Sequence, residues 1–140
     1  MRGAALAAAL AVGLFGCGGD DESTAPQSSS TELDVSLDVD GPGGEPPREA
    51  SLSCPDTDSA ACDAVAGLPR DPAAPVPPQT ACTEIFGGPE VVTLSGTLRG
   101  ESIDASLTRA DGCQIERFNR FTRLLQELFP DYRPGEALIQ

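Results

Sequence analysis

The cysteines carry the most definite chemistry in this sequence. Four of the five lie in the body of the chain, at Cys54, Cys62, Cys82 and Cys113. They form no Cys-x-x-Cys pair, which favours two disulfides over the alternative, a four-cysteine zinc site. Four cysteines allow three pairings. We favour the sequential one, Cys54–Cys62 with Cys82–Cys113, which closes a small loop and a larger one.

The segment around Cys82 has the composition of an exposed loop. Residues 80–89 read TACTEIFGGP and have neither helical nor strand periodicity. A proline-rich run, DPAAPVPP at residues 71–78, precedes them. A segment that is fixed at a cysteine and flanked by proline and glycine is typical of a loop held out for contact with another molecule.

The charge balance excludes several classes of function. The chain of 140 residues has a formal net charge of −13 and no histidine or lysine, so all nine basic residues are arginine. Nucleic-acid binding needs a positive surface and is excluded. Without histidine there is no Ser-His or Cys-His pair and no histidine metal site. The carboxylates are scattered, so we expect neither an enzyme nor a cofactor.

The N-terminus predicts export. Residues 4–15 form an apolar run that is too short to span a bilayer. The run leads into LFGC at residues 14–17, which resembles a bacterial lipobox and implies cleavage before Cys17 and acylation of that cysteine. The alternative is an ordinary secretory signal with a coincidental cysteine, and both place the domain outside the cytoplasm. Removal of residues 1–16 loses one arginine, which takes the net charge from −13 to −14, and residues 18–30 have the composition of a flexible linker.

Alternating apolar and polar residues predict an antiparallel sheet. Residues 32–40 alternate leucine and valine with aspartate and serine, and residues 50–54 form a shorter strand. A hairpin follows the loop, in which a type II′ turn at residues 100–101 would pair Leu98 with Ile103. Every apolar side chain of the hairpin then lies on one face. We interpret the outward aspartates as a solvated face, with a metal ladder as the alternative.

Two helices are expected. Residues 60–66 form a short helix that ends at a glycine and a proline. From about Glu116 to Pro130, apolar residues recur at helical spacing with arginines on the other face. This helix covers the sheet, with a dimer contact or a membrane-surface helix as alternatives, and the tail from Asp131 is expected to be loose. Asp56, Asp58 and Asp63 lack the pattern of a calcium loop, and we interpret them as a solvated turn.

Together these pieces resemble the Streptomyces subtilisin inhibitor-like family of secreted serine-protease inhibitors. The matching stretches are SLSC at residues 51–54, ACD at 61–63, PEVVTLSGTLRGE at 89–101 and DGC at 111–113, with Cys82 before the third. The strand at Leu33 matches the family's first strand, so the resemblance covers residues 33–115. It implies an antiparallel sheet with two helices, the same disulfide pairing, and often a homodimer.

The resemblance also implies a reactive loop. In the family the reactive bond lies two residues after the third cysteine. The corresponding loop here is Cys82, Thr83, Glu84, Ile85 and Phe86, with Glu84–Ile85 as the scissile bond, and the implied partner is a serine endopeptidase. Because Glu84 is acidic, the resemblance indicates a glutamate-preferring protease. The alternative is a non-inhibitory binding or structural lipoprotein on the same scaffold.

We therefore expect an α+β protein with four parts. These are a signal peptide at residues 1–16, an acylated Cys17 with a linker over residues 17–30, an inhibitor-like domain at residues 31–115, and a helix with a tail at residues 116–140. The protein is expected to be extracytoplasmic, either anchored to a membrane through Cys17 or secreted.

Overall fold

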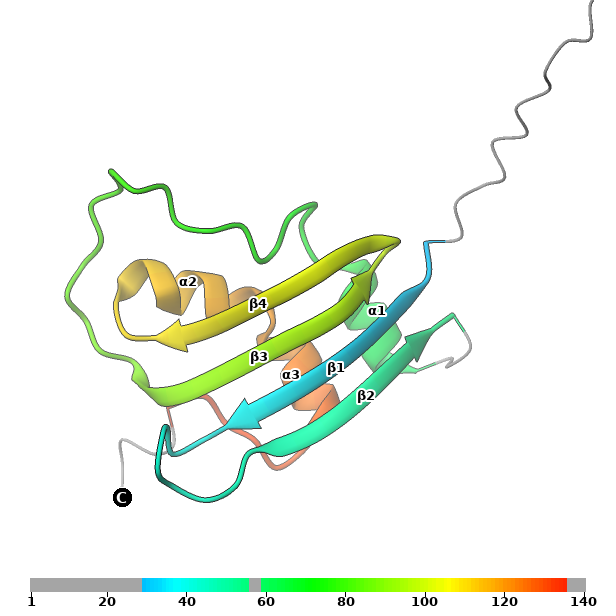
Figure 1. The fold of residues 1–140 in the computed structure, drawn as a ribbon, viewed down its shortest axis with the longest axis horizontal. Coiled ribbons are helices and arrows are strands. Elements are labelled where there is room, and N and C mark those ends of the chain that lie inside the picture. Colours follow the sequence, from blue (N-terminus) through cyan, green and yellow to red (C-terminus); the bar gives the residue numbers. More distant parts are fainter. Residues whose placement is uncertain (1–28, 56–58, 136–140) are drawn as a thin grey trace, which may run out of the picture.

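Four antiparallel strands form one sheet in the order β2-β1-β3-β4 (Figure 1). The computed structural model describes residues 29–55 and 59–135. The strands are β1 (Thr31–Asp38), β2 (Arg48–Cys54), β3 (Gly88–Leu98) and β4 (Glu101–Arg109). Three helices, α1 (Ala60–Ala66), α2 (Gly112–Arg120) and α3 (Thr122–Leu128), lie on one side of the sheet. The antiparallel sheet, the helices and two disulfides confirm the expected α+β fold.

The N-terminal expectations fall outside the described part of the chain. The signal peptide at residues 1–16, Cys17 and the linker up to residue 28 all lie there. Within residues 29–55 and 59–135, no helix combines the length and the apolar composition that crossing a membrane requires. The domain boundaries stay predictions.

The alternation in β1 decides which side of the sheet is buried. Leu33, Val35 and Leu37 are at most 2% exposed, whereas Asp34 on the opposite face is exposed. On that outer face the Ser51 hydroxyl donates to Asp34 Oδ1 at 2.6 Å, and both residues are exposed to solvent. The core is completed mainly by Leu52, Ala61, Ala64, Val65, Val92, Leu94, Leu98, Leu107, Phe118, Phe121, Leu124, Leu125 and Phe129.

The β3–β4 hairpin has a different register from the expected one. Its turn is Arg99-Gly100, so Leu98 pairs with Glu101, and the expected pairing of Leu98 with Ile103 was wrong. The partner of Leu98 is displaced by two residues, which keeps the apolar side chains on one face. The φ angles are 51° at Arg99 and 85° at Gly100, as in a type I′ turn rather than the expected type II′ turn.

Tertiary contacts explain why arginine occupies a left-handed position in this turn. The N–H of Arg99 donates to Thr31 Oγ1 at 2.9 Å, and its guanidinium donates to the carbonyl oxygens of residues 68–70. These bonds offset the cost of a positive φ, which is of order 1–2 kcal/mol for a residue with a Cβ atom.

The second expected helix begins earlier and is divided. Helix α2 begins at Gly112 rather than near Glu116, and the helical run breaks at Phe121. Asp111 is the N-cap, and its Oδ1 accepts the N–H of Gln114 at 2.9 Å. This side-chain bond starts a helix where a turn was expected.

The segment that follows α3 is packed rather than loose as far as residue 135. Tyr132 is only 2% exposed, and the N–H of Gly135 donates to Glu90 Oε1. The expectation of a loose tail from Asp131 was therefore wrong for residues 131–135, because burial of the Tyr132 ring and the bond to Glu90 hold them.

Candidate functional site

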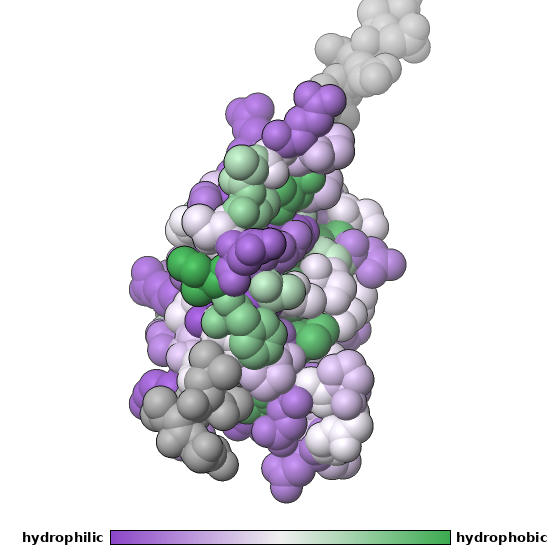
Figure 2. Space-filling view, turned by 90° about the vertical axis from the view of Figure 1, so that its left-hand side faces the viewer, coloured by the Kyte–Doolittle hydropathy of each residue, from purple (hydrophilic) through white to green (hydrophobic). Residues whose placement is uncertain are grey.

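The segment that carries the expected reactive bond is exposed at one end of the sheet. Thr83, Glu84, Ile85 and Phe86 are all exposed to solvent. Ile85 is 61% and Phe86 56% exposed, which makes them the exposed large apolar side chains of the described residues. Figure 2 views this end of the molecule, where apolar surface lies among hydrophilic residues. Adjacent exposed apolar side chains at a loop tip are suited to contact with a partner.

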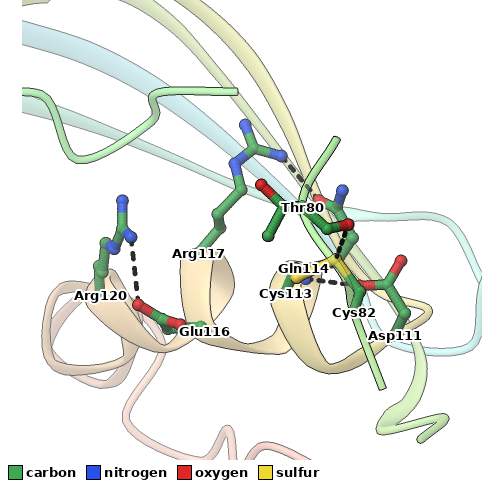
Figure 3. Close-up of a disulfide and its surroundings, with 8 residues drawn as sticks. All are labelled: Thr80, Cys82, Asp111, Cys113, Gln114, Glu116, Arg117 and Arg120. Carbon is green, nitrogen blue, oxygen red and sulfur yellow. Dashed lines mark hydrogen bonds and ion pairs between the residues drawn. A yellow bond between two sulfur atoms is a disulfide. The ribbon is translucent and has the colours of Figure 1, made fainter. Parts of the chain in front are cut away.

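The N-terminal side of this loop is fixed to the start of α2. Cys82 and Cys113 form a disulfide with their Cα atoms 5.4 Å apart (Figure 3). Beside it, the N–H of Gly112 donates to the Thr83 carbonyl oxygen at 2.9 Å. A Cβ atom at Gly112 would lie 3.3 Å from Thr83 Cβ and in collision with Thr83 Oγ1, so glycine permits this close approach. A covalent bond and a hydrogen bond thus hold Cys82 and Thr83.

The C-terminal side of the loop is fixed at Gly87. The N–H of Gly87 donates to the Arg109 carbonyl oxygen at 2.8 Å, and Arg109 Nε donates to the Gly87 carbonyl oxygen at 3.0 Å. Gly87 is buried, and a Cβ atom there would lie 2.8 Å from the Ile115 side chain. One arginine therefore binds both backbone polar groups of the residue at which the loop rejoins the fold.

Both anchors come from one short connection. Strand β4 ends at Arg109 and α2 begins at Gly112, so residues 109–113 contact the loop on both sides. Only Glu84, Ile85 and Phe86 lie between the fixed residues Thr83 and Gly87. The arrangement presents a short exposed segment whose two ends are held by the same part of the fold.

Arginines also fix the proline-rich approach to the loop. Arg117 donates through Nε and Nη2, at 2.8 Å each, and Arg120 donates through Nη1, to carbonyl oxygens of residues 72–74. Arg99 binds the carbonyl oxygens of residues 68–70. Proline has no N–H with which to join a sheet, so these guanidinium groups supply the contacts that order the run.

A buried carboxylate lies behind Gly87. Glu90 is 1% exposed, with Oε2 3.6 Å from Arg109 Nε and Oε1 accepting the N–H of Gly135. Burial, and secondly the negative charge of Glu90, raise the pKa of the nearby Tyr132 phenol well above its usual value of about 10. The tyrosine is therefore neutral over the physiological range, beside a charged pair.

The cysteines form the sequential pairs that the sequence favoured. Cys54 bonds Cys62, and Cys82 bonds Cys113. The zinc alternative was wrong because all four thiols are used in these bonds. Two disulfides in a domain of this size indicate an oxidising compartment.

The described residues bring one group of potential metal ligands together. These are Cys82, Asp111 and Cys113, and two of the three are the bridged sulfurs. Asp63 is exposed, and Asp56 and Asp58 lie outside the described residues.

Several supporting residues were missed at the level of sequence. Arg109 is far from the loop in sequence and no local pattern marks it, whereas Gly112 was noted only as part of the DGC stretch and not as a contact of the loop. Glu90 had a signal, because it occupies an inward position of an otherwise apolar strand face. A charged residue at such a position indicates a buried partner.

Comparison with known proteins gives little beyond this geometry. No protein-family model matches the chain, and no curated protein matches it. A solved structure that is similar is Streptomyces caespitosus sermetstatin in complex with Bacillus licheniformis subtilisin. The two chains are 22% identical, the match covers 74% of this chain and 99% of sermetstatin, and the TM-score is 0.39. At this identity and score the likeness supports no conclusion about function.

Proposed function

We propose that this protein is an extracytoplasmic inhibitor of a serine protease rather than an enzyme. It binds through a substrate-like loop in which Glu84–Ile85 is the scissile bond, and lipid on Cys17 anchors it to a membrane. The resemblance of residues 33–115 to subtilisin inhibitor-like proteins supports the first part of the proposal, and the lipobox-like LFGC supports the second.

The observation that carries the proposal is fixation on both sides of three exposed residues. The disulfide of Cys82 and the hydrogen bond to Thr83 fix one side, and Arg109 fixes Gly87 on the other. A structural loop without a partner has no need of this much support for so short an exposed stretch.

Fixation lowers the cost of binding. Proteases bind substrates as extended strands through main-chain hydrogen bonds and a side-chain pocket. A flexible peptide loses about 1–2 kcal/mol of backbone entropy per residue when it is ordered, and a preorganised loop avoids most of this loss. In an extended segment successive carbonyl groups point to opposite sides. Since the Thr83 carbonyl is bound to Gly112, those of Cys82 and Glu84 would face the protease.

The same fixation favours inhibition over digestion. If the protease cuts Glu84–Ile85, Glu84 extends one residue beyond the fixed Thr83, and Ile85 and Phe86 extend two residues beyond the fixed Gly87. Residues span at most about 3.5 Å each, so the new ends stay within reach of one another. The cut bond can then re-form before the pieces separate.

The loop residues define the chemistry of the target. The residue before the scissile bond enters the main specificity pocket, and burial of an unpaired carboxylate there is costly. Glu84 therefore fits a pocket that contains a cationic or hydrogen-bonding group, as in a glutamate-preferring protease. The exposed Ile85 and Phe86 fit apolar subsites on the other side of the bond.

The position of the loop suits presentation from a surface. The carbonyl of Ser30, at the start of the described chain, accepts the N–H of Gly100 at 2.8 Å, at the hairpin end of β3. The loop joins the opposite end of this 11-residue strand, about 33 Å away for ten steps of about 3.3 Å. A tether that ends at Ser30 leaves the loop at the far end of the domain.

Titration against a panel of serine proteases tests the proposal. The full chain in detergent should give saturable, stoichiometric inhibition of a glutamate-preferring protease. Glu84→Gln should weaken that inhibition roughly 10- to 100-fold, the value of a charge-assisted hydrogen bond. The matched control is Glu101→Gln, which makes the same change at an exposed site at the hairpin end and should inhibit like the wild type.

The acidity of Glu84 favours one second candidate. In this alternative the chain is a binding or structural lipoprotein that has the inhibitor-like fold but does not inhibit a protease. If the chain inhibits no glutamyl-, trypsin- or subtilisin-type protease, and the proteases that accept the sequence of the loop digest it completely, this candidate is supported and inhibition is rejected.

A further inference from the structure

Glu90 and Arg109 form a buried ion pair next to Gly87, where the loop rejoins the fold. We propose that Arg109 is the positioning residue for the C-terminal half of the loop, and that its pairing with Glu90 keeps the amine end of a cut Glu84–Ile85 bond in place. This inference rests on the proposed inhibitory function, which it extends to a residue whose side chain is only 11% exposed.

Arg109 binds Gly87 through both its backbone and its side chain. Its carbonyl oxygen accepts the Gly87 N–H at 2.8 Å, and its Nε donates to the Gly87 carbonyl oxygen at 3.0 Å. Two bonds to the two polar groups of one residue fix the orientation of the backbone as well as its position. The first belongs to the main chain and survives substitution, but the second depends on the guanidinium.

The guanidinium is itself held from several directions. Its side chain is 11% exposed, and Nε lies 3.6 Å from Oε2 of Glu90, whose side chain is fully buried. Nη1 donates to Asn119 Oδ1 at 3.2 Å, and the guanidinium carbon lies 5.2 Å from the centre of the Phe118 ring. Arginine stays charged at every accessible pH, so the buried carboxylate has a permanent partner.

The segment after α3 completes this support. The N–H of Gly135 donates to Oε1 of Glu90, so the carboxylate is bound on one oxygen while the other faces Arg109. A Cβ atom at Gly135, where φ is +78°, would lie 3.6 Å from the Gly87 carbonyl oxygen. Three parts of the chain that are distant in sequence thus converge behind the residue that anchors Ile85 and Phe86.

The chemistry makes this position important. The protease serine oxygen attacks the Glu84 carbonyl carbon, the C–N bond breaks, and the Ile85 nitrogen leaves as an amine that has taken up a proton. In the reverse step the amine attacks the same carbon, the ester C–O bond breaks, and the proton returns to the serine oxygen. Water competes for this ester and leaves a carboxylate on Glu84. Re-formation wins only while the amine stays close to the ester.

Loss of the guanidinium should therefore change the fate of the complex. Freedom at Gly87 in the cut form should lower the local concentration of the Ile85 amine roughly tenfold. In the intact loop Gly87 is still held by its main-chain bond to Arg109 and by the continuous chain from Thr83, so the loss of preorganisation is smaller before cleavage than after it. The initial binding should therefore weaken less than hydrolysis accelerates.

Arg109→Gln tests the inference, with Arg117→Gln as the matched control. Both side chains donate to backbone carbonyls, but Arg117 binds the proline-rich run and not the loop. In the full chain, hydrogen exchange of the Gly87 amide should be roughly tenfold faster in Arg109→Gln than in the control. The protease should hydrolyse this variant roughly tenfold faster, with a binding constant within about threefold of the wild type.

The outcomes separate the two proposals. Equal Gly87 exchange in Arg109→Gln and Arg117→Gln overturns the positioning role, as does faster exchange without faster hydrolysis. If the wild type inhibits no protease, the proposed function fails, and the exchange data alone decide whether Arg109 positions the loop. If Arg109→Gln unfolds because Glu90 is left unpaired, the double variant with Glu90→Gln removes both charges and takes its place with the same expected results.

Discussion

Removal of the Cys82–Cys113 disulfide should damage stability and inhibition in separable ways. The Cys82–Cys113 bond joins residues that are 31 positions apart in sequence, whereas the Cys54–Cys62 bond joins residues that are 8 positions apart. The loop-entropy relation gives about 3.7 kcal/mol for the first and about 2.5 kcal/mol for the second. All four cysteines are half-buried, so the double variants Cys82→Ala with Cys113→Ala and Cys54→Ala with Cys62→Ala remove side chains of similar burial and can be compared directly. Urea unfolding should give losses in free energy close to these two values.

The effect on cleavage should differ far more than the effect on stability. Without the first disulfide, Cys82 and Thr83 are free in the cut chain and gain about 2–4 kcal/mol of backbone entropy. Cleavage at Glu84–Ile85 by a glutamate-preferring protease, followed by mass spectrometry, should then be roughly 100-fold faster than in the wild type. The alanine pair at Cys54 and Cys62 should be cut like the wild type. Equal cleavage of the two pairs, at a temperature where both are folded, would refute the reasoning.

Three further results are expected. Glu84→Arg should lose at least roughly 100-fold in affinity for a glutamate-preferring protease and gain inhibition of a trypsin-like one, which competitive titration measures; retained glutamyl specificity would contradict the assignment of the bond. Gly112→Ala should cost about 1–3 kcal/mol in urea unfolding and weaken inhibition, because its Cβ atom would displace Thr83, and wild-type values for both would show that the close contact is not needed. Tyr132 is the one tyrosine of the chain, so phenolate absorbance should be missing near pH 10 in the folded protein, because burial and Glu90 raise its pKa. The stability that the neutral Tyr132 phenol contributes is complete below the unfolded pKa of about 10 and is lost as pH rises toward the higher folded pKa. Tyr132→Phe should therefore lose less stability than the wild type above about pH 10. Phenolate absorbance that appears near pH 10 in the folded protein would contradict the burial of Tyr132.

The sequence was sufficient for features that depend on local patterns. The alternation around Val35 set the buried face of β1, because side chains on a strand alternate with a period of two. Four cysteines without a Cys-x-x-Cys pair favoured two disulfides, and the sequential pairing that we preferred is the one that the structure contains. The exposure of Ile85 and Phe86 was also predictable, because residues 80–89 have neither helical nor strand periodicity that would place them on a buried face.

The remaining features depend on contacts between distant residues. The turn was misplaced because Arg99 adopts a positive φ, which is offset by bonds to residues 68–70 that no turn rule contains. The start of α2 was missed although Asp111 and Gln114 have the spacing of an N-cap and the third residue of a helix. The contacts of Arg109 with Gly87 and Glu90 could not be predicted, because these residues are far from Arg109 in sequence and become its neighbours only after folding.

The most direct test of the central claim is an equilibrium approached from both sides. Intact protein, and protein already cut at Glu84–Ile85 with its disulfides in place, would each be incubated with a catalytic amount of a glutamate-preferring protease. If the loop holds the cut ends together, both samples should converge on the same mixture of intact and cut chains, with bond re-formation visible in the second. If the first sample is converted fully to cut chain and the second never regains the bond, the loop is an ordinary cleavage site.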